Sequence, residues 1–410
     1  MLATTTTTEQ AYDDVCDVHV FGKNGCDTLI SVSQISARQV QKALTVPQAF
    51  QYEIRHDFPI PEIIEDDEIM IRGRAVGLNP IDFMTVDHNF CLPSFPWVCS
   101  MLFYNWCLRW DIIGDGSRGS RSRGKDGISC YQIQNRRSSL GQYDHIPLRD
   151  SRPFSDKLLG TYYRDVRAAC FQELVVVPQH TVSPIPPNLS FESAACLGVP
   201  GLTAAMTLWK WLRVPFPSSA ANTPKSNDHI VIWGGSTITG QFLIQLAVHC
   251  GLTVIAVASK RTQNLVRSLG ADYVVTRDHQ TNEDIAAMIR DIGSDRITRA
   301  VDLVGSETAT AALSTLSKSR PSIFAPLSKA IQHDGKSLNV EIADVQMKWF
   351  ILDSSSEIYS TWLNELLASG LIKIPQLEIL CGGLEDVVRG LELLKRGDRG
   401  GRKLVVTISW

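Results

Sequence analysis

Several common patterns are missing from this 410-residue sequence, and each absence excludes a class of protein. Its 10 cysteines form no Cys-x-x-Cys pair and no cluster with metal-ligand spacing, which indicates free thiols in a reducing compartment. Residues 1–10 are rich in threonine and lack both a basic start and an apolar core. No signal peptide is therefore predicted, and a cytoplasmic protein is expected.

Charge and catalytic motifs are also sparse. A formal net charge of −3 gives no general attraction to nucleic acid or to an anionic membrane, so neither partner is expected. The sequence shows no Ser-His-Asp order and no recognisable pair of catalytic carboxylates. Tyrosines and lysines occur, but no spacing singles one out as a general acid, and the catalytic residues stay unassigned.

What is present begins with a βαβ pattern in the middle of the chain. An apolar run, 229–233, ends at Gly234 and Gly235, and apolar residues then recur at helical spacing up to residue 248. A second β-branched run follows at 253–258. Strand, tight turn, helix and strand in this order are typical of a dinucleotide-binding unit.

The turn in this unit is a variant of G-x-G-x-x-G. Thr237 stands where the middle glycine normally lets the backbone approach a pyrophosphate. Hydroxyl groups at a helix N-terminus still favour an anion, although the same residues would also fit a capped helix without a ligand. We predict cofactor contacts from Gly235, Ser236, Thr237, Ile238, Thr239 and Gly240.

The end of the second strand indicates which dinucleotide is bound. NAD sites carry Asp or Glu there to hold the ribose hydroxyls, whereas this chain has Ser259, Lys260, Arg261 and Thr262. Two cations and a hydroxyl suit a 2′-phosphate, so the pattern favours NADPH. The alternative is that both cations lie on a solvated helix start.

The chain before this unit has a β-rich texture. Short runs at 42–46, 50–54 and 68–78 are predicted to be strands, and the motif Asn79-Pro80-Ile81-Asp82 follows them. With this motif the chain resembles the medium-chain dehydrogenase/reductases, and among them the zinc-independent, trans-acting enoyl reductases of fungal polyketide biosynthesis. The resemblance covers roughly 39–97 and 168–408. It implies an α/β fold with a GroES-like β-rich domain and a Rossmann doubly wound parallel sheet.

The resemblance also implies a division into domains. Residues 1–38 would be an N-terminal extension, expected to be disordered, and 39–190 the GroES-like substrate domain. Residues 191–365 would form the NADPH-binding Rossmann domain, and 366–410 would return to the GroES-like domain. At 410 residues, two domains are also the natural expectation from length.

Residue types at the motif decide the question of zinc. Zinc-dependent members carry a cysteine where Asn79 stands, together with a Gly-His-Glu motif, and neither is present, so no metal is predicted. In zinc-free relatives the Asn-Pro-x-Asp loop lies against the cofactor, which implies contacts from Asn79, Pro80, Ile81 and Asp82. A proline turn with an Asx hydrogen bond is the alternative.

Further site residues follow from the resemblance. Arg277 stands close to a position where relatives carry a tyrosine near the adenosine end, and a cation there still suits a phosphate. Leu303 ends a strand where the nicotinamide would lie, and the tail adds Arg399 and Gly400. A small-residue helix entrance would border the substrate channel, although close helix packing explains it as well; its residues are Gly201, Leu202, Thr203, Ala204 and Ala205.

The function implied is an NADPH-dependent trans-enoyl reductase. It would reduce the α,β-double bond of an enoyl thioester carried by a partner polyketide synthase in secondary metabolism, with hydride added at the β-carbon and a proton at the α-carbon. Two alternatives stay open: an NADPH quinone or enone reductase acting on small free substrates, and a catalytically impaired pseudoenzyme.

Residues 98–165 depart from the family pattern. Asp111 to Gly114 fits a remnant of a family strand, but the Gly/Ser/Arg-rich run at 115–125 does not. Prolines and a short apolar length argue against a membrane span, and the basic run lacks the aromatic residues of a nucleic-acid platform. We interpret the segment as a mistranslated stretch, from a retained intron or a shifted frame; as genuine protein it would place activity in doubt.

Overall fold

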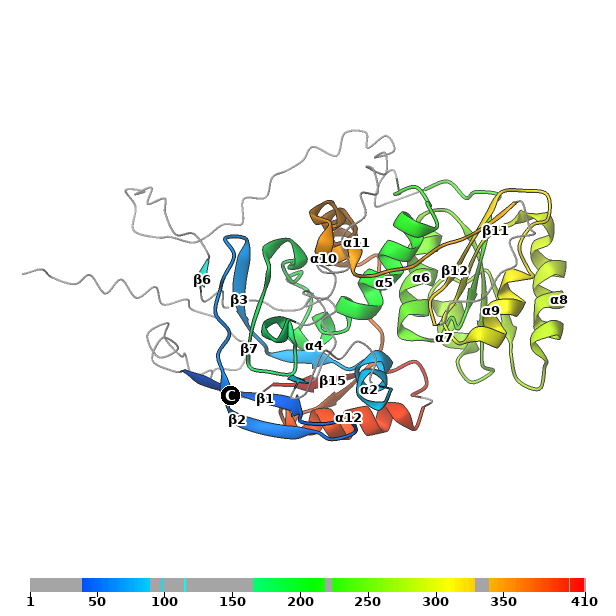
Figure 1. Ribbon diagram of the computed structural model, residues 1–410. Helices are drawn as coiled ribbons and strands as arrows, with labels where there is room; N and C mark the ends of the chain where they lie inside the picture. Colours follow the sequence, from blue (N-terminus) through cyan, green and yellow to red (C-terminus); the bar gives the residue numbers. More distant parts are fainter. Residues whose placement is uncertain are drawn as a thin grey trace, which may run out of the picture.

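The computed structural model describes residues 39–88, 97–98, 114–115, 165–217, 223–328, 339–397 and 399–408. These residues form a β-rich first lobe and a second lobe built on one large parallel sheet (Figure 1). The predicted α/β fold class is confirmed. The expectations for 1–38 and for most of 98–165 lie outside the described residues.

The second lobe contains a six-stranded, all-parallel sheet. Its strand order is β10-β9-β8-β11-β12-β13, so the order reverses between β8 and β11, as in a dinucleotide-binding doubly wound sheet. The strands are β8 (His229–Trp233), β9 (Thr253–Ala258), β10 (Tyr273–Thr276), β11 (Ile297–Asp302), β12 (Ser322–Pro326) and β13 (Val340–Ile342).

Helices cover both faces of this sheet, and alternate strand residues supply the two cores. On β8, Ile230 and Ile232 pack with α5 (Leu202–Met206), α6 (Ile238–His249) and α11 (Glu357–Ala368). Val231 and Trp233 point to the opposite face and pack with α8 (Asn282–Gly293) and α9 (Ser306–Leu313). The central strands β8 and β9 are buried along their whole length, which is why they read as largely apolar runs. The remaining helices of this lobe are α7 (Gln263–Ser268) and α10 (Trp349–Leu352), with short turns at Ser294–Arg296 and Ser354–Ser356.

The first lobe consists of three small sheets. Their orders are β2-β1-β5, β6-β3-β7 and β14-β15-β4. The strands are β1 (Val40–Val46), β2 (Glu53–Pro59), β3 (Glu68–Arg72), β4 (Ala75–Gly77), β5 (Trp97–Val98), β6 (Gly114–Asp115), β7 (Leu174–Pro178), β14 (Leu377–Leu380) and β15 (Lys403–Thr407). Two helices, α2 (Pro80–Asp87) and α12 (Glu385–Lys395), pack against each other, and short turns lie at Val166–Ala168 and Gln179–Thr181.

The tail of the chain is built into this lobe. Strand β15 lies between β14, to which it is parallel, and β4, to which it is antiparallel. Its buried residues Leu404 and Val406 join the same core as Leu44 and Phe171. The C-terminal strand therefore contacts parts of the chain more than 300 positions earlier.

Two strand predictions need correction. The run 68–78 is not one strand, because it breaks at residues 73–74 into β3 and β4, which belong to different sheets. The run 50–54 is a turn followed by β2, and Phe50 has a positive φ of 63°. By contrast, Gly114 does lie in a short strand: β6 pairs antiparallel with β3 at Ile69 and Met70.

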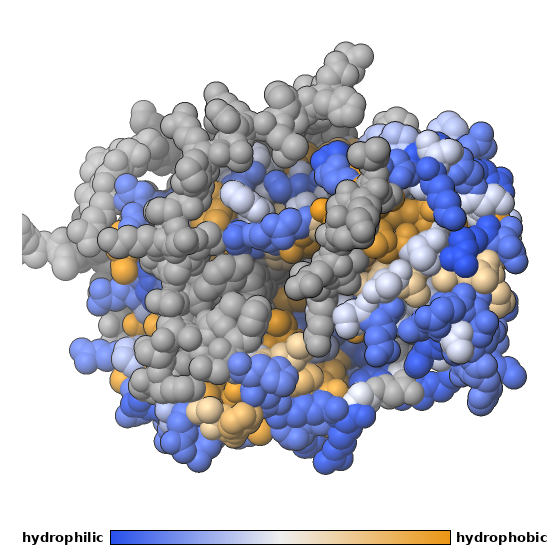
Figure 2. Space-filling model, turned by 45° about the vertical axis from the view of Figure 1, so that its right-hand side comes forward, coloured by the Kyte–Doolittle hydropathy of each residue, from blue (hydrophilic) through white to orange (hydrophobic). Residues whose placement is uncertain are grey.

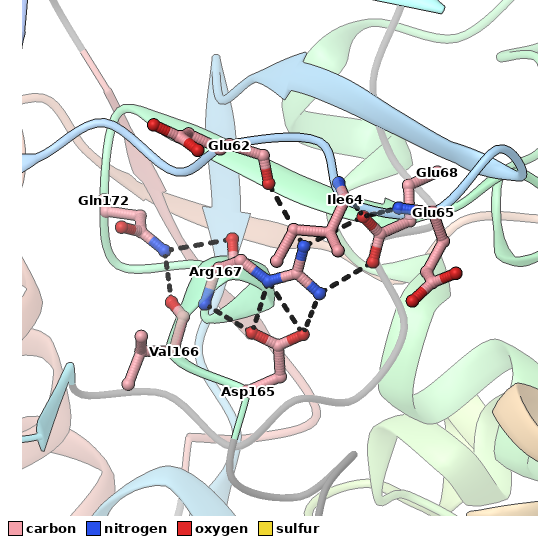
Figure 3. A network of polar contacts seen from close by, with 8 residues as sticks. All are labelled: Glu62, Ile64, Glu65, Glu68, Asp165, Val166, Arg167 and Gln172. Carbon is pink, nitrogen blue, oxygen red and sulfur yellow. Dashed lines mark hydrogen bonds and ion pairs between the residues drawn. The ribbon is translucent and has the colours of Figure 1, made fainter. Parts of the chain in front are cut away.

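A polar network holds the chain in the first lobe at residues 165–167, where the described residues resume (Figure 3). The Arg167 guanidinium donates to both carboxylate oxygens of Glu68, at 2.7 and 2.8 Å, and to those of Asp165, at 2.7 to 3.1 Å. Glu68 also accepts from the backbone N–H groups of Ile64 and Glu65. Burial alone would raise the pKa of Glu68, but Arg167 and these N–H groups outweigh it and hold the pKa below its ordinary value.

One helical stretch, Phe191–Trp211, is long and apolar enough by composition to cross a membrane. It combines α4 (Phe191–Ala194), α5 and two wider turns at Leu197–Gly201 and Thr207–Trp211, and 67% of its apolar window is buried. The core helix of a soluble protein passes the same test, so this stretch is weak evidence for a membrane span.

Candidate active site

The reversal of strand order defines the site. Two loops leave the carboxyl ends of the neighbouring strands β8 and β11, and the backbone N–H of Leu303 donates to the carbonyl of Trp233 at 3.0 Å. Gly234 has a φ of +95°, and a Cβ added there would come within 3.0 to 3.2 Å of Val304 and Leu303. The predicted nicotinamide residue Leu303 thus lies against the start of the glycine turn.

The carboxylate of Asp302 shapes the second of these loops. One of its oxygens accepts from the N–H groups of Val304 and Gly305 and from the Ser328 hydroxyl, at 3.0 to 3.2 Å. The other oxygen is buried and has no hydrogen-bond partner among the described residues. Burial raises the pKa of this carboxyl group, against the effect of its hydrogen bonds.

The glycine turn is closed from inside by a threonine. The Thr237 hydroxyl donates to the Gly234 carbonyl at 2.9 Å and accepts from the Gly240 N–H at 3.0 Å, so it caps α6. A Cβ added at Gly240 would come within 2.4 Å of the Gly234 carbonyl oxygen, so this position requires glycine. Of the three hydroxyls considered from the sequence, that of Thr237 serves the turn, whereas those of Ser236 and Thr239 have no hydrogen-bond partner among the described residues.

The turn fits an anionic ligand. Helix α6 is 12 residues long and begins at Ile238 with no acidic residue in its first turn. The first N–H groups of a helix have no partner within the helix, and the helix dipole favours negative charge there. The turn residues 236–239 are each only partly buried. A pyrophosphate would therefore meet N–H groups and hydroxyls without a competing carboxylate in that turn.

The predicted adenosine end of the cofactor site contains residues that follow two neighbouring strands, β9 and β10. Lys260 and Arg277 each follow one strand end, at Ala258 of β9 and Thr276 of β10, and both side chains are exposed. Ser259 and Thr262 are bonded to each other through their hydroxyls at 2.9 Å, so these hydroxyls close a turn. No carboxylate follows β9 in the sequence, but the Asp278 carboxylate, just after β10, accepts a hydrogen bond from the backbone N–H of Lys260.

The C-terminal loop before β15 also reaches the site. A Cβ added at Gly400 would lie 3.6 Å from the Arg261 guanidinium, and one at Gly401 would lie 3.2 Å from the Ser236 carbonyl. Arg399 forms an ion pair with Glu378. The structure thus brings the predicted residues Arg261, Ser236 and Gly400 together around one loop.

Gln241 is a residue that the sequence-based reasoning missed. Its side-chain amide donates to the carbonyls of both Ser236 and Gly401, at 3.0 and 2.8 Å, and so ties the glycine turn to the C-terminal loop. It lies in α6 and is 1% exposed. Two glutamines, Gln241 and Gln245, in the otherwise apolar helix run 241–248 were the available signal.

The Asn79 motif is the start of a helix rather than a proline turn. Asn79 is the N-cap of α2 and Pro80 its first residue, and the Asp82 carboxylate accepts from the Asn79 N–H at 2.7 Å. Both side chains are buried, at 8% and 3% exposure. Asp82 is thus committed to the helix start, and Pro80 and Ile81 are the more exposed members of the motif.

The predicted substrate helix is mostly core. Leu202, Ala204 and Ala205 are 0% exposed, and a Cβ added at Gly201 would lie 3.2 Å from Leu363 of α11. Close helix packing, the alternative considered from the sequence, accounts for these four positions. Thr203 is the partly exposed member and stays the candidate for a substrate contact. Hydrophobic residues gather along the middle of the face shown in Figure 2.

The ranges described by the structure contain no group of three or more His, Cys, Asp and Glu side chains that would hold a metal ion. Asn79 instead presents an amide, whose nitrogen donates to the Gly77 carbonyl at 2.9 Å.

Comparison with known proteins agrees with this geometry. Residues 239–320 match the family described as zinc-binding dehydrogenase. The trans-enoyl reductase himH of Aspergillus japonicus is 34% identical over 253 residues, covering 60% of this chain and 71% of the relative. The trans-enoyl reductase buaC of Petromyces alliaceus is 25% identical over 385 residues, covering 89% and 96%.

Solved structures share the fold at low sequence identity. A mycobacterial protein complexed with NADPH has a TM-score of 0.63 at 17% identity, covering 90% of this chain and 99% of its own. A quinone oxidoreductase of Pseudomonas syringae reaches 0.64 at 18% identity, with coverage of 89% and 99%. The JamJ enoyl reductase reaches 0.62 at 16% identity, with coverage of 90% and 100%.

The fold and the site define a medium-chain dehydrogenase/reductase, a class of nicotinamide-dependent oxidoreductases. The match to the zinc-binding family falls within the second lobe, whereas Asn79, which stands at the zinc-ligand position, lies in the first lobe. Within the zinc-independent branch, the chain belongs to the trans-enoyl reductase family.

Proposed function

We propose that this protein binds NADPH at the β8–β11 crossover and reduces the α,β-double bond of an enoyl thioester carried by a partner polyketide synthase. The bound dinucleotide would supply the hydride. The protein's own residues would hold the pyrophosphate at the α6 N-terminus, the 2′-phosphate beside Lys260 and Arg277, and the nicotinamide beside Leu303. The proton donor is unassigned.

One observation carries this proposal. Residues predicted independently as cofactor contacts, at Ser236, Arg261, Leu303 and Gly400, lie around one turn although they come from four separate segments. Two exposed cations at the ends of β9 and β10 favour a ligand with a phosphate at the adenosine ribose. The named trans-enoyl reductase relatives support the thioester substrate.

Cofactor binding is the first test. Purified protein is titrated with NADPH and with NADH, followed by cofactor fluorescence, at two salt concentrations. We expect NADPH-selective binding that weakens as salt rises, because the selectivity depends on charge. Equal affinity for the two cofactors would overturn the 2′-phosphate assignment. Absence of binding by folded protein would overturn the proposal that the protein is an NADPH-dependent enzyme.

Turnover is the second test. NADPH oxidation is measured with an enoyl thioester of a short pantetheine-like carrier and with the same acyl chain on an acyl carrier domain. Faster turnover on the carrier domain supports the trans-acting role. Cofactor binding without turnover of any acceptor would identify a pseudoenzyme.

A second function is favoured by the fold likeness to a quinone oxidoreductase. In that case a small free quinone or enone would be reduced at least as fast as the thioester. Running these acceptors beside the thioesters, with the same enzyme preparation, separates the two functions.

A further inference from the structure

The side chain of Lys403 lies buried beside the Asn79 loop. Lys403 is the first residue of β15 and is 3% exposed. Its ammonium donates to the Leu78 carbonyl at 2.7 Å and to the side-chain oxygen of Asn79. Its Cε lies 3.0 Å from where a Cβ would stand on Gly77, so the lysine stem runs directly over β4.

These contacts fix the orientation of the Asn79 amide. The amide oxygen faces Lys403 and the amide nitrogen donates to the Gly77 carbonyl at 2.9 Å. The backbone N–H of Asn79 is held by Asp82 at 2.7 Å. The backbone N–H and both side-chain polar atoms of Asn79, the N-cap of α2, are therefore held by partners, and the Lys403 ammonium is one of them.

A buried cation in this position carries a cost. Burying an ammonium group costs several kcal/mol by general estimates. The buried thiol of Cys196 is close enough for the Lys403 charge to oppose the rise that burial gives its pKa. An apolar side chain of similar length would avoid the cost of burying the charge, but it would leave the Leu78 carbonyl and the Asn79 side-chain oxygen without this donor.

The same short segment contacts the cofactor turn at its other end. Gly401, two residues before Lys403, accepts from Gln241, whose amide also donates to the Ser236 carbonyl. Three consecutive residues span at most about 10 Å. Residues 401–403 thus connect the glycine turn of the second lobe to the Asn79 loop of the first.

We propose that Lys403 is a positioning residue that holds the Asn79 loop at a fixed distance from the glycine turn, so that a cofactor bound in the turn meets the first lobe in a productive geometry. The inference rests on the proposed function for its kinetic consequence. Its structural part, the ordering of the α2 start by Lys403, does not depend on activity.

The test compares Lys403→Met with Lys395→Met. Lys395 is a matched control because it pairs with Asp87 at the far end of the same helix α2, at 3.1 Å. With saturating NADPH and substrate, we expect Lys403→Met to lower kcat by about 10- to 100-fold, since small misplacements carry penalties of this size. Lys395→Met should stay within about threefold, because this partly buried ion pair lies at the end of α2 away from Asn79.

Two further readouts separate positioning from loss of folding. Because Lys403→Met leaves the Leu78 carbonyl and the Asn79 side-chain oxygen without this donor, its thermal midpoint should fall modestly, and kcat is therefore measured well below that midpoint. The kinetic isotope effect with NADPH deuterated at C4 should rise, because hydride transfer becomes slower than product release. A kcat within threefold of wild type, or a loss that follows the folded fraction, overturns the proposal.

Hydrogen–deuterium exchange tests the structural part without any cofactor. We expect faster exchange of the amides in 78–84 for Lys403→Met than for Lys395→Met. If Lys403→Met fails to fold, Asn79→Ala removes the other partner of the same contact and should give the same exchange pattern. Unchanged exchange overturns the inference even in an active enzyme, whereas an inactive wild type with the expected exchange pattern overturns only the proposed function.

Discussion

The carboxylate of Asp278 accepts a hydrogen bond from the backbone N–H of Lys260, at the point where β9 and β10 end side by side. A negative charge thus lies within the cluster of cations proposed to hold a 2′-phosphate. Like charges repel at short range, so Asp278 would weaken NADPH binding while leaving NADH unaffected.

Asp278→Asn tests this relationship. The amide oxygen of asparagine still accepts from Lys260, but the charge is gone. We expect the Kd for NADPH to fall by about two- to fivefold at low salt, the range of an exposed charge interaction, and that for NADH to stay constant. Glu283→Gln, on the exposed first turn of α8, is the control. Weaker NADPH binding by Asp278→Asn would mean that the Asp278 carboxylate orders the turn at Lys260 and does not repel the 2′-phosphate.

Removing either cation, Lys260 or Arg277, should weaken NADPH binding. Lys260→Ala and Arg277→Ala should each raise the Kd for NADPH about tenfold, since a charge-assisted hydrogen bond contributes about 1.5–3 kcal/mol. Binding of NADH should not change. Lys225→Ala is the control, because Lys225 pairs with Asp272 near the amino end of the sheet. Equal losses for NADPH and NADH would contradict a 2′-phosphate site.

Two glycines near the site should differ in their tolerance to alanine. At Gly240 an added Cβ would lie 2.4 Å from the Gly234 carbonyl, whereas at Gly305 nothing lies within 4 Å and φ is extended, at 175°. We expect Gly240→Ala to cost about 1–3 kcal/mol through overpacking and Gly305→Ala less than about 0.5 kcal/mol. Urea unfolding midpoints measure both, and similar midpoints would show that the turn relaxes.

The Arg167–Glu68 contact should make the first lobe sensitive to acid. The folded-state pKa of Glu68 lies below its ordinary value of 4.5, so its contribution to stability is present above that value and is lost as pH falls further. Glu68→Gln should therefore flatten the decline of the thermal midpoint between about pH 5 and 3. Glu62→Gln is matched, because Glu62 contacts Arg167 through its backbone carbonyl alone. An unchanged acid decline in Glu68→Gln would contradict this account.

The parts predictable from sequence were those with a local cause. The central strands β8 and β9 are largely apolar runs, and the turn from Gly234 to Gly240 carries its own glycines, so both were visible in one window of sequence. The break of 68–78 into two strands was not visible, because the partners that separate them, β7 and β15, come from distant parts of the chain.

Among the site residues, too, those with a local cause were predictable and those set by distant contacts were not. Thr237 was recognisable as a possible cap, and the structure gives it that role. Asp278, Gln241 and Lys403 were missed because each acts on a segment 5 to 325 positions away, and no local pattern marks such contacts. The four buried positions of the substrate helix looked like a channel wall because small residues suit both a channel and close packing.

The placement of β15 has a consequence for how the protein folds while it is being synthesised. The strands of the second lobe come from one continuous stretch, whereas the first lobe needs β15, which is made after that stretch and pairs with β4, which is made before it. Domains generally fold as units as synthesis proceeds. The second lobe can thus fold during synthesis, before β15 is made to complete the β14-β15-β4 sheet of the first lobe. A chain truncated before Lys403 would keep a folded second lobe attached to a first lobe without a strand of its core.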